Sequence, residues 1–273
     1  MNNKKFISPE IEKNTIEELS KQLIKANSEL RKLQDEREIM FANISHDLRA
    51  PMTAIRSAVD LVLSEDNPTR EELLSTIELI DRRSKTLESL VNDMYFLYSV
   101  SNVPKAFEFE EIEAAPFLEE YFFDLKTDSR FEAFDMVLDI EQGMDCVINI
   151  DVQKMIRVLD NLFTNAARYA SGDKDNKKKT GIRLKAKFDK NRLMVSVKDN
   201  GPGISEKDLP YVFMRTYTAS GARTPESAKS GSGLGLSIVK AIIEKHKGTI
   251  ECRSTLGEGS EFIISIPANI RIR

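Results

Sequence analysis

The sequence predicts an α plus α/β protein, in which a helical hairpin is followed by a two-layer α/β sandwich. Apolar residues between positions 16 and 44 recur at alternating spacings of three and four, which is the pattern of a coiled-coil seam. From residue 146 onward, short strand-like runs are interspersed with amphipathic helical segments, as in two-layer α/β domains. Because the pattern changes near residue 104, we expect two structural units.

The composition is that of an ordinary globular protein. The length of 273 residues, with 31% charged and 41% hydrophobic side chains, allows one to two domains with a sizeable core. A net charge of −4 argues against nonspecific binding of nucleic acid. The two cysteines, Cys146 and Cys252, match no metal-ligand spacing and fit a reducing intracellular setting. No apolar run approaches the roughly 18 residues of a membrane span, so we expect a cytoplasmic chain, either soluble or part of a larger protein.

The first helical segment carries one of the two histidines of the chain. Arg37 is the one polar break in its seam, which is formed by Ile16, Leu19, Leu23, Ala26, Leu30, Leu33, Met40 and Ile44. His46 follows two positions after the seam, so we expect it to face solvent beside Asp47. Pro51 removes the hydrogen bond to the carbonyl of Asp47, which predicts a weakened helix at this point. Taken alone, the stretch also fits a surface histidine on a purely structural coiled coil.

A second helix is expected after a turn at residues 66–68, with Thr69 as its N-cap. Its apolar residues keep helical spacing up to a linker at 101–104: Leu73, Ile77, Ile80, Leu87, Leu90, Val91, Met94, Leu97 and Val100. One hairpin cannot bury both of its apolar stripes. We therefore expect a homodimer in which two hairpins form a four-helix bundle.

The α/β unit is expected to contain helices and antiparallel strand pairs. The predicted helices are 115–125, 152–170 and a third that begins after the glycines of 231–235. The predicted strands are 146–150, 181–188, 193–199, 248–253 and 260–266. His246, near the end of the third helix, is interpreted as a charge on the C-terminal end of the helix dipole rather than as a catalytic residue.

The helix after Asp151 has two distinct faces. Its apolar stripe consists of Met155, Val158, Leu159, Leu162, Phe163 and Ala166. Asn161, Asn165 and Arg168 form a second stripe at spacings of four and three. Asparagine is a mediocre helix former, so two on one face indicate amide-oxygen ligands for the Mg²⁺ of a nucleotide, with Arg168 near phosphate. A solvated polar face is the alternative interpretation.

Two glycine-rich turns flank a segment without apolar periodicity. Asp199 ends a strand and precedes Gly201 and Gly203, which allow the backbone to approach a flat ligand closely. A buried aspartate at such a position can accept a hydrogen bond from an exocyclic amine such as that of adenine, although the turn could also be purely structural. Residues 216–232 have the character of a lid or a disordered loop.

The second turn opens a helix. It runs Gly231-Ser232-Gly233-Leu234-Gly235-Leu236, and a glycine-rich turn at a helix N-terminus is a site for phosphate. No strand leads directly into these glycines, and no Gly-Lys-Ser/Thr occurs there. This context excludes a Rossmann fingerprint and a Walker phosphate loop.

Together, these motifs resemble the catalytic core of sensor histidine kinases of two-component systems, over about residues 30–268. Residues 45–51 are similar to the family's phosphoacceptor box, and residues 161–169 to its asparagine box. Residues 199–203 are similar to the first glycine box and residues 212–217 to the phenylalanine box. Residues 231–236 and 257–262 are similar to the second and the last glycine box. Each motif is modest, but their shared order and spacing are specific.

The resemblance implies an ATP-binding domain of the Bergerat type, with ATP between the asparagine helix and a lid. It implies that Asp199 binds the adenine amine, that Asn165 and Asn161 hold Mg²⁺, and that Arg168 and Arg215 face the phosphates. Further nucleotide-binding positions implied by the resemblance are Tyr169, Gly201, Gly203, Gly231, Gly233, Leu234, Gly235 and Leu236.

The implied activity is autophosphorylation of His46 from ATP, assisted by Asp47, and transfer to an aspartate of a response regulator. The implied domains are a coiled-coil signalling helix (1–40), a dimerisation and histidine phosphotransfer hairpin (41–103) and a catalytic ATP-binding domain (104–273). The chain would then be soluble or the cytosolic part of a membrane-anchored sensor. Alternatives are another ATPase of the same superfamily, such as the gyrase or heat-shock chaperone type, and a non-catalytic nucleotide-binding dimeric scaffold.

The sequence departs from the family at three positions. Ala50 stands where the family often has threonine or asparagine, which predicts weak phosphatase activity towards the partner. Thr216 stands where an aromatic residue is usual, and Lys247 where glycine is common. Neither of these two is expected to contact the reacting groups.

Overall fold

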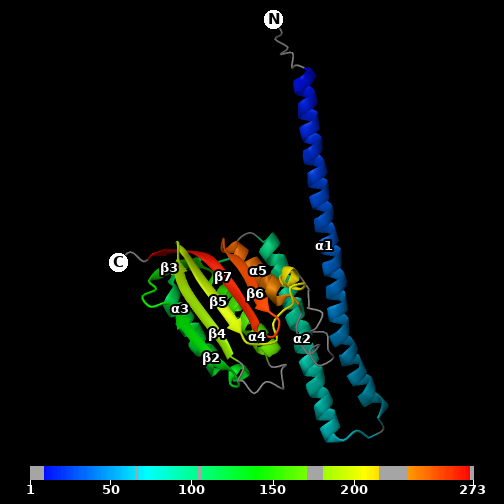
Figure 1. The fold of residues 1–273 in the computed structure, drawn as a ribbon. Helices are drawn as coiled ribbons and strands as arrows, with labels where there is room; N and C mark the ends of the chain where they lie inside the picture. Colours follow the sequence, from blue (N-terminus) through cyan, green and yellow to red (C-terminus); the bar gives the residue numbers. More distant parts are fainter. Residues whose placement is uncertain (1–8, 66, 104–105, 171–180, 215–232, 271–273) are drawn as a thin grey trace.

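The computed structural model describes residues 9–65, 67–103, 106–170, 181–214 and 233–270, and shows a long helical hairpin beside an α/β domain (Figure 1). The hairpin consists of α1 (Pro9–Ser64) and α2 (Arg70–Asn102). The domain contains α3 (Ala114–Thr127), α4 (Val152–Ala170), α5 (Gly235–Lys245) and the short 3-10 helices η1 (Ser129–Phe131) and η2 (Leu209–Tyr211). Its strands are β1 (Glu110–Glu113), β2 (Asp135–Ile140), β3 (Cys146–Ile150), β4 (Gly181–Asp189), β5 (Arg192–Asp199), β6 (Thr249–Thr255) and β7 (Gly259–Ile270).

Helix α1 runs without interruption through Pro51, so the expected weakening does not break the helix. The N-terminal part of α1 projects beyond α2 and beyond the α/β domain (Figure 1). Its seam residues Leu19, Leu23 and Leu30 are 54%, 64% and 56% exposed. Ile44, lower on the same seam, is buried in the hairpin.

The predicted N-cap of α2 is confirmed. The side chain of Thr69 accepts a hydrogen bond from the backbone N–H of Glu72, and the backbone N–H of Thr69 donates to the Glu72 carboxylate. Such a capping box satisfies two N–H groups that have no partner within the helix. It fixes the start of α2 immediately after the hairpin turn.

The sheet is mixed and has seven strands in the order β1-β3-β7-β5-β4-β2, with β6 pairing with β7. The β2–β4 pair is parallel and the other pairs are antiparallel. The predicted hairpins β4–β5 and β6–β7 are confirmed, and Lys190 and Asn191 adopt positive φ in the two-residue turn of the first, as a type I′ turn requires. The sequence did not predict β1 or β2.

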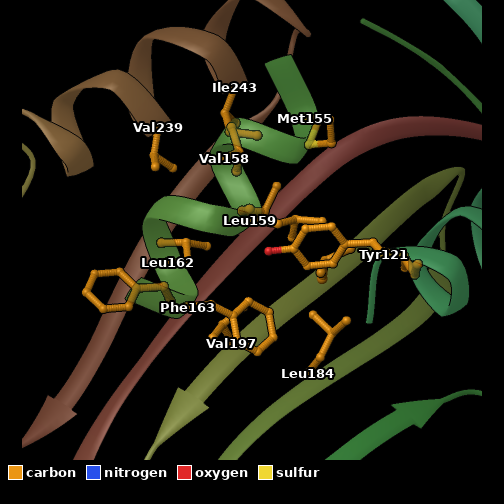
Figure 2. Close-up of a cluster of buried hydrophobic side chains, with 14 of the residues drawn as sticks. Tyr121, Met155, Val158, Leu159, Leu162, Phe163, Leu184, Val197, Val239 and Ile243 are labelled. Atoms are coloured by element: carbon orange, nitrogen blue, oxygen red, sulfur yellow. The ribbon is translucent and has the colours of Figure 1, made fainter. Parts of the chain in front are cut away.

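Helices α3, α4 and α5 pack against the sheet and enclose the core (Figures 1 and 2). The predicted apolar stripe of α4 is fully buried, and its Phe163 lies 6.0–6.4 Å, between ring centroids, from Tyr121, Phe122 and Phe131. Figure 2 shows α4 between α5 and the strand residues Leu184 and Val197. This packing gives the two-layer sandwich and leaves the polar face of α4 to the site.

Within the described part of the chain, no helix combines the length and the apolar character needed to cross a membrane.

Candidate functional site

Asp199 lies at the end of β5 and is only 6% exposed. Its Oδ1 accepts hydrogen bonds from the backbone N–H of Gly201 at 2.9 Å and of Ser260 at 3.3 Å. Burial raises the pKa of the Asp199 carboxyl despite these two bonds, which favour the ionised form. The carboxyl is therefore held rigidly in a site with little access to water.

Glycines bring the turns of the site close together. A Cβ on Gly203 would overlap the carbonyl of Thr255, and one on Gly259 would overlap the carbonyl of Asp199. Both glycines also have positive φ, which other residues rarely adopt. The tip of the β6–β7 hairpin can thus pack directly on the Asp199 turn.

The amide of Asn161 lies at the junction of α4 and α5. Its Nδ2 donates a hydrogen bond to the carbonyl of Arg157 at 2.8 Å, and a Cβ built on Gly235 would lie only 2.7 Å from its Oδ1. Asn165 is half-buried on the same face of α4, whereas Arg168 and Tyr169 are exposed. The predicted asparagine face therefore meets the predicted phosphate-binding turn.

The start of α5 is fixed by its own backbone. Gly233 has a φ of +59°, Leu234 is buried, and the hydroxyl of Ser237 donates to the carbonyl of Leu234 at 2.8 Å. Gly235 and Leu236 are partly exposed at the first helical positions. The first N–H groups of a helix have no partner within it, so this end can bind an anion.

Arg215 and Gly231, and with them half of the phenylalanine box and the expected lid, lie outside the described residues.

His46 lies on α1, well apart in sequence from these groups, and its side chain is 79% exposed. Its Nδ1 is 3.3 Å from Oδ1 of Asp47. The expected solvent-facing position and the expected partner of the ring are both observed.

The interpretation of His246 as a helix-end charge is wrong. The residue does follow α5 directly, but it is 4% exposed. Its Nε2 accepts a hydrogen bond from the N–H of Asp151 at 3.0 Å, and its Nδ1 donates to the carbonyl of Ile242 at 2.8 Å. Burial lowers the pKa of His246, so the ring is neutral at pH 7 and has a structural role.

The sequence also gave no signal for the contact between the hairpin and α4. Arg157 forms an ion pair with Asp93 of α2 at 2.6 Å, and its guanidinium carbon lies 4.1 Å from the centroid of the Phe96 ring. Phe96 belongs to the same buried cluster as the core of the α/β domain. The two units therefore share one continuous interface.

The described residues contain no cluster of three or more His, Cys, Asp or Glu side chains that could hold a metal ion. A metal at this site would depend on neutral oxygens such as that of Asn161, together with nucleotide phosphates, and this suits Mg²⁺.

Two known families match the chain. Residues 36–102 match the His Kinase A (phospho-acceptor) domain, and residues 150–270 match the histidine kinase-, DNA gyrase B-, and HSP90-like ATPase. The chain belongs to the sensor histidine kinase family.

Similar proteins include two sensor protein kinases named WalK. The chain is 31% identical to that of Staphylococcus aureus over 245 residues, covering 89% of this chain and 56% of the relative. It is also 31% identical to the WalK of Staphylococcus saprophyticus over 249 residues, which cover 89% of this chain and 38% of that relative. The chain thus spans about half or less of the length of these relatives.

Solved structures of histidine kinases share the fold. AdeS of Acinetobacter baumannii superposes with a TM-score of 0.59 at 22% identity, covering 82% of this chain and 98% of that one. Histidine kinase ThkA, in complex with response regulator protein TrrA, superposes with a TM-score of 0.64 at 23% identity, and the match covers 84% of this chain and 60% of that one. The helical hairpin followed by a Bergerat-type ATPase domain is therefore confirmed.

Proposed function

We propose that this chain is an ATP-dependent protein histidine kinase that autophosphorylates His46 and passes the phosphoryl group to an aspartate of a response regulator. The proposal depends on two features found together. One is an exposed His46 in contact with Asp47, and the other is a separate Bergerat-type site formed by the Asp199 turn and the start of α5, called the Asp199 cradle below. A gyrase- or chaperone-type ATPase needs no such histidine on a helical hairpin.

The contact with Asp47 assigns roles to the two ring nitrogens of His46. With Nδ1–H donating to the Asp47 carboxylate, the lone pair of Nε2 faces solvent as the nucleophile. Nε2 attacks the γ-phosphorus of ATP, the bond to the leaving ADP oxygen breaks, and Asp47 stabilises the charge that develops on the ring. Phosphoryl transfer otherwise needs mainly in-line placement and charge neutralisation.

The cradle supplies that placement. We propose that the Asp199 carboxylate accepts a hydrogen bond from the adenine amine and that the N–H groups from Gly233 to Leu236 hold the phosphates. Mg²⁺ bound to the nucleotide would neutralise phosphate charge, and Asn165 together with Asn161 would hold it. Arg168 and Arg215 would face the phosphates, with Tyr169, Gly201, Gly203 and Gly231 completing the site.

The exposed apolar stripes support a homodimer through the hairpin. On α1, Leu19, Leu23 and Leu30 are each more than half exposed. On α2, Val91, Tyr95 and Tyr98 share one face at spacings of four and three and are also exposed. We propose that a second copy covers these stripes, with the projecting part of α1 in a two-stranded coiled coil and the α1–α2 hairpins in a four-helix bundle.

We keep the division into 1–40, 41–103 and 104–273 as a proposal, although α1 passes through position 40 without a break. The receiver domain of a response regulator would dock beside His46, because its aspartate must reach Nε2. The weak phosphatase activity expected from Ala50, which lies one helical turn after His46, stays a prediction to be tested with Ala50→Thr.

The proposal is tested by incubating the protein with γ-labelled ATP and Mg²⁺ and then exposing it to acid and to base. The expected label is stable in base, is lost in acid as a phosphoramidate, and is absent from His46→Gln. ATP binding, measured in parallel, should be unchanged in this variant because His46 lies outside the cradle.

Label that persists in His46→Gln, or that survives acid, would contradict the proposal. An unlabelled wild-type protein that still binds ATP would favour the non-catalytic scaffold.

A further inference from the structure

A cavity of about 270 Å³ lies away from the candidate nucleotide site, where the C-terminal end of α5 meets β1, β3 and β7. Two strands pair with the same edge of β7: β6 as far as Ser265, and β3 from Ala268 onward. Ile266 and Pro267 therefore lie in the gap between them, and Pro267 brings no N–H that would need a partner there. The sheet therefore forms one side of the cavity, and Phe109, His246 and Lys247 from the adjoining segments form the other.

The walls of the cavity combine an apolar, partly aromatic part with a polar rim. They include Phe109, Ile148, Pro267 and the ring of His246. Both nitrogens of His246 are already engaged within the protein, so the residue offers a ring rather than a polar group. Since a 150 Å³ cavity accommodates benzene, this one suits a body of one or two fused rings.

The rim of the cavity carries more positive than negative charge. Lys245 and Lys247 line it together with a single carboxylate, that of Glu111. The amides of Asn149 and Asn269 provide further hydrogen-bonding groups. All five side chains are exposed, so the rim favours the polar, negatively charged end of a ligand whose body enters the cavity.

The backbone of Lys247 makes this residue a suitable site for a test. The residue has a φ of +56°, a conformation that strains a lysine and that glycine adopts freely. The turn alone would be satisfied by glycine. The side chain of Lys247 lines the cavity, so Lys247→Gly removes its charge from the rim while keeping a backbone conformation that suits glycine.

We propose that this cavity binds a small aromatic carboxylate, with its ring against Phe109 and Pro267 and its carboxylate on Lys245 and Lys247. The site is separate from the Asp199 cradle, so binding does not compete with ATP. Phe109 belongs to the segment that joins the hairpin to the α/β domain, and its ring lies 5.0 Å from that of His246. A bound ligand would thus hold this joining segment in place.

The test is titration of the full chain with indole-3-carboxylate, followed by calorimetry and by NMR. Indole-3-carboxamide, which has the same shape without the charge, is the matched ligand. We expect the carboxylate to bind at least ten-fold more tightly than the carboxamide. A non-hydrolysable ATP analogue should leave this binding unchanged.

The matched variants separate binding from stability. Lys247→Gly should weaken carboxylate binding at least ten-fold, while the melting temperature of the free protein stays the same or rises because the strain is relieved. Lys245→Gln should also weaken binding, whereas Lys240→Gln, an exposed lysine of α5 outside the cavity, should not.

Any of four results would overturn the proposal, and the first three concern a ligand that does bind. These are equal binding of carboxylate and carboxamide, unchanged binding in Lys247→Gly, and competition with the ATP analogue. Absence of saturable binding at millimolar concentrations would overturn it as well.

Discussion

The amide oxygen of Asn161 occupies the space that a side chain at position 235 would need, 2.7 Å from a Cβ built on Gly235. This contact joins the helix that carries the two asparagines to the helix whose N-terminus is the candidate phosphate site. Gly235 does not have a positive φ, so its backbone conformation does not require glycine. The close contact with Asn161 does.

We therefore predict that Gly235→Ala weakens ATP binding by at least ten-fold, because the new methyl group displaces the Asn161 amide. Binding of a fluorescent ATP analogue measures the loss. The free energy of unfolding should fall in Gly235→Ala and recover when Asn161→Ala is added, since alanine is intrinsically a better helix former than glycine by about 1 kcal/mol. Strictly additive effects of the two substitutions on stability would show that the side chains do not conflict.

Asp199→Asn should raise the stability of the free protein and lower its affinity for ATP. The folded state raises the pKa of this carboxyl, so the folded state binds its proton more tightly, and stability falls as pH rises above the unfolded value of about 3.9. At pH 7 and without nucleotide, the variant should therefore be more stable than the wild type. Its affinity for ATP should fall about 10- to 100-fold, because the charged acceptor for the adenine amine is lost.

Thermal unfolding with and without ATP measures both effects. Asp189→Asn, an exposed aspartate at the far end of the same hairpin, is the control and should change neither quantity. A nucleotide-free Asp199→Asn protein that is less stable than the wild type would contradict the argument from burial.

His246 predicts a loss of stability in mild acid. Its pKa is lowered by burial, so the unfolded chain binds the proton more tightly, and stability is lost as pH falls below the unfolded value of about 6.5. The slope from this residue is at most about 1.4 kcal/mol per pH unit. Denaturant unfolding between pH 5 and 7.5 should show the slope in the wild type and in His46→Gln, but not in His246→Gln.

Leu23→Glu should dissociate the dimer, because it places a charge in the coiled-coil seam where the side chain is 64% exposed in a single chain. Sedimentation should change from twice the chain mass of 31.0 kDa to the chain mass itself. Ser28→Glu adds the same charge about 140° around the helix and should remain dimeric. A monomeric wild-type protein would refute the proposed bundle.

The Asp93–Arg157 pair should couple the hairpin to the α/β domain. The 2.6 Å contact is partly buried, and Arg157 also stacks on Phe96. A double-mutant cycle of Asp93→Asn and Arg157→Gln should give a coupling free energy on the order of 1–2 kcal/mol. The exposed pair Arg56–Asp60 is the control, with an expected coupling of about 0.5 kcal/mol or less. Equal couplings would mean that the interface is not desolvated.

Local patterns in the sequence were sufficient for much of this protein. The helix α1, the Thr69 cap, the buried stripe of α4 and the two hairpins depend on residues a few positions apart, and the structure confirms all of them. The coiled-coil seam of α1 stays a prediction, because a second copy would have to cover it. The motif residues Asn161, Asp199 and Gly235 were likewise recognised from short spacings. Helical and strand periodicities determine such features directly.

Only the tertiary structure decided the rest. Strand β2 forms by parallel pairing with β4, which begins more than forty residues later in the chain, and the short acidic β1 has no apolar alternation to reveal it. His246 is neutral because burial in the packed core lowers its pKa, although the carbonyl of Ile242 and the charge of Asp151 raise it. The same reason applies to β1, β2 and His246. Burial and strand pairing between distant segments depend on which segments meet in the folded chain, and the periodicity of a short stretch of sequence does not contain that information.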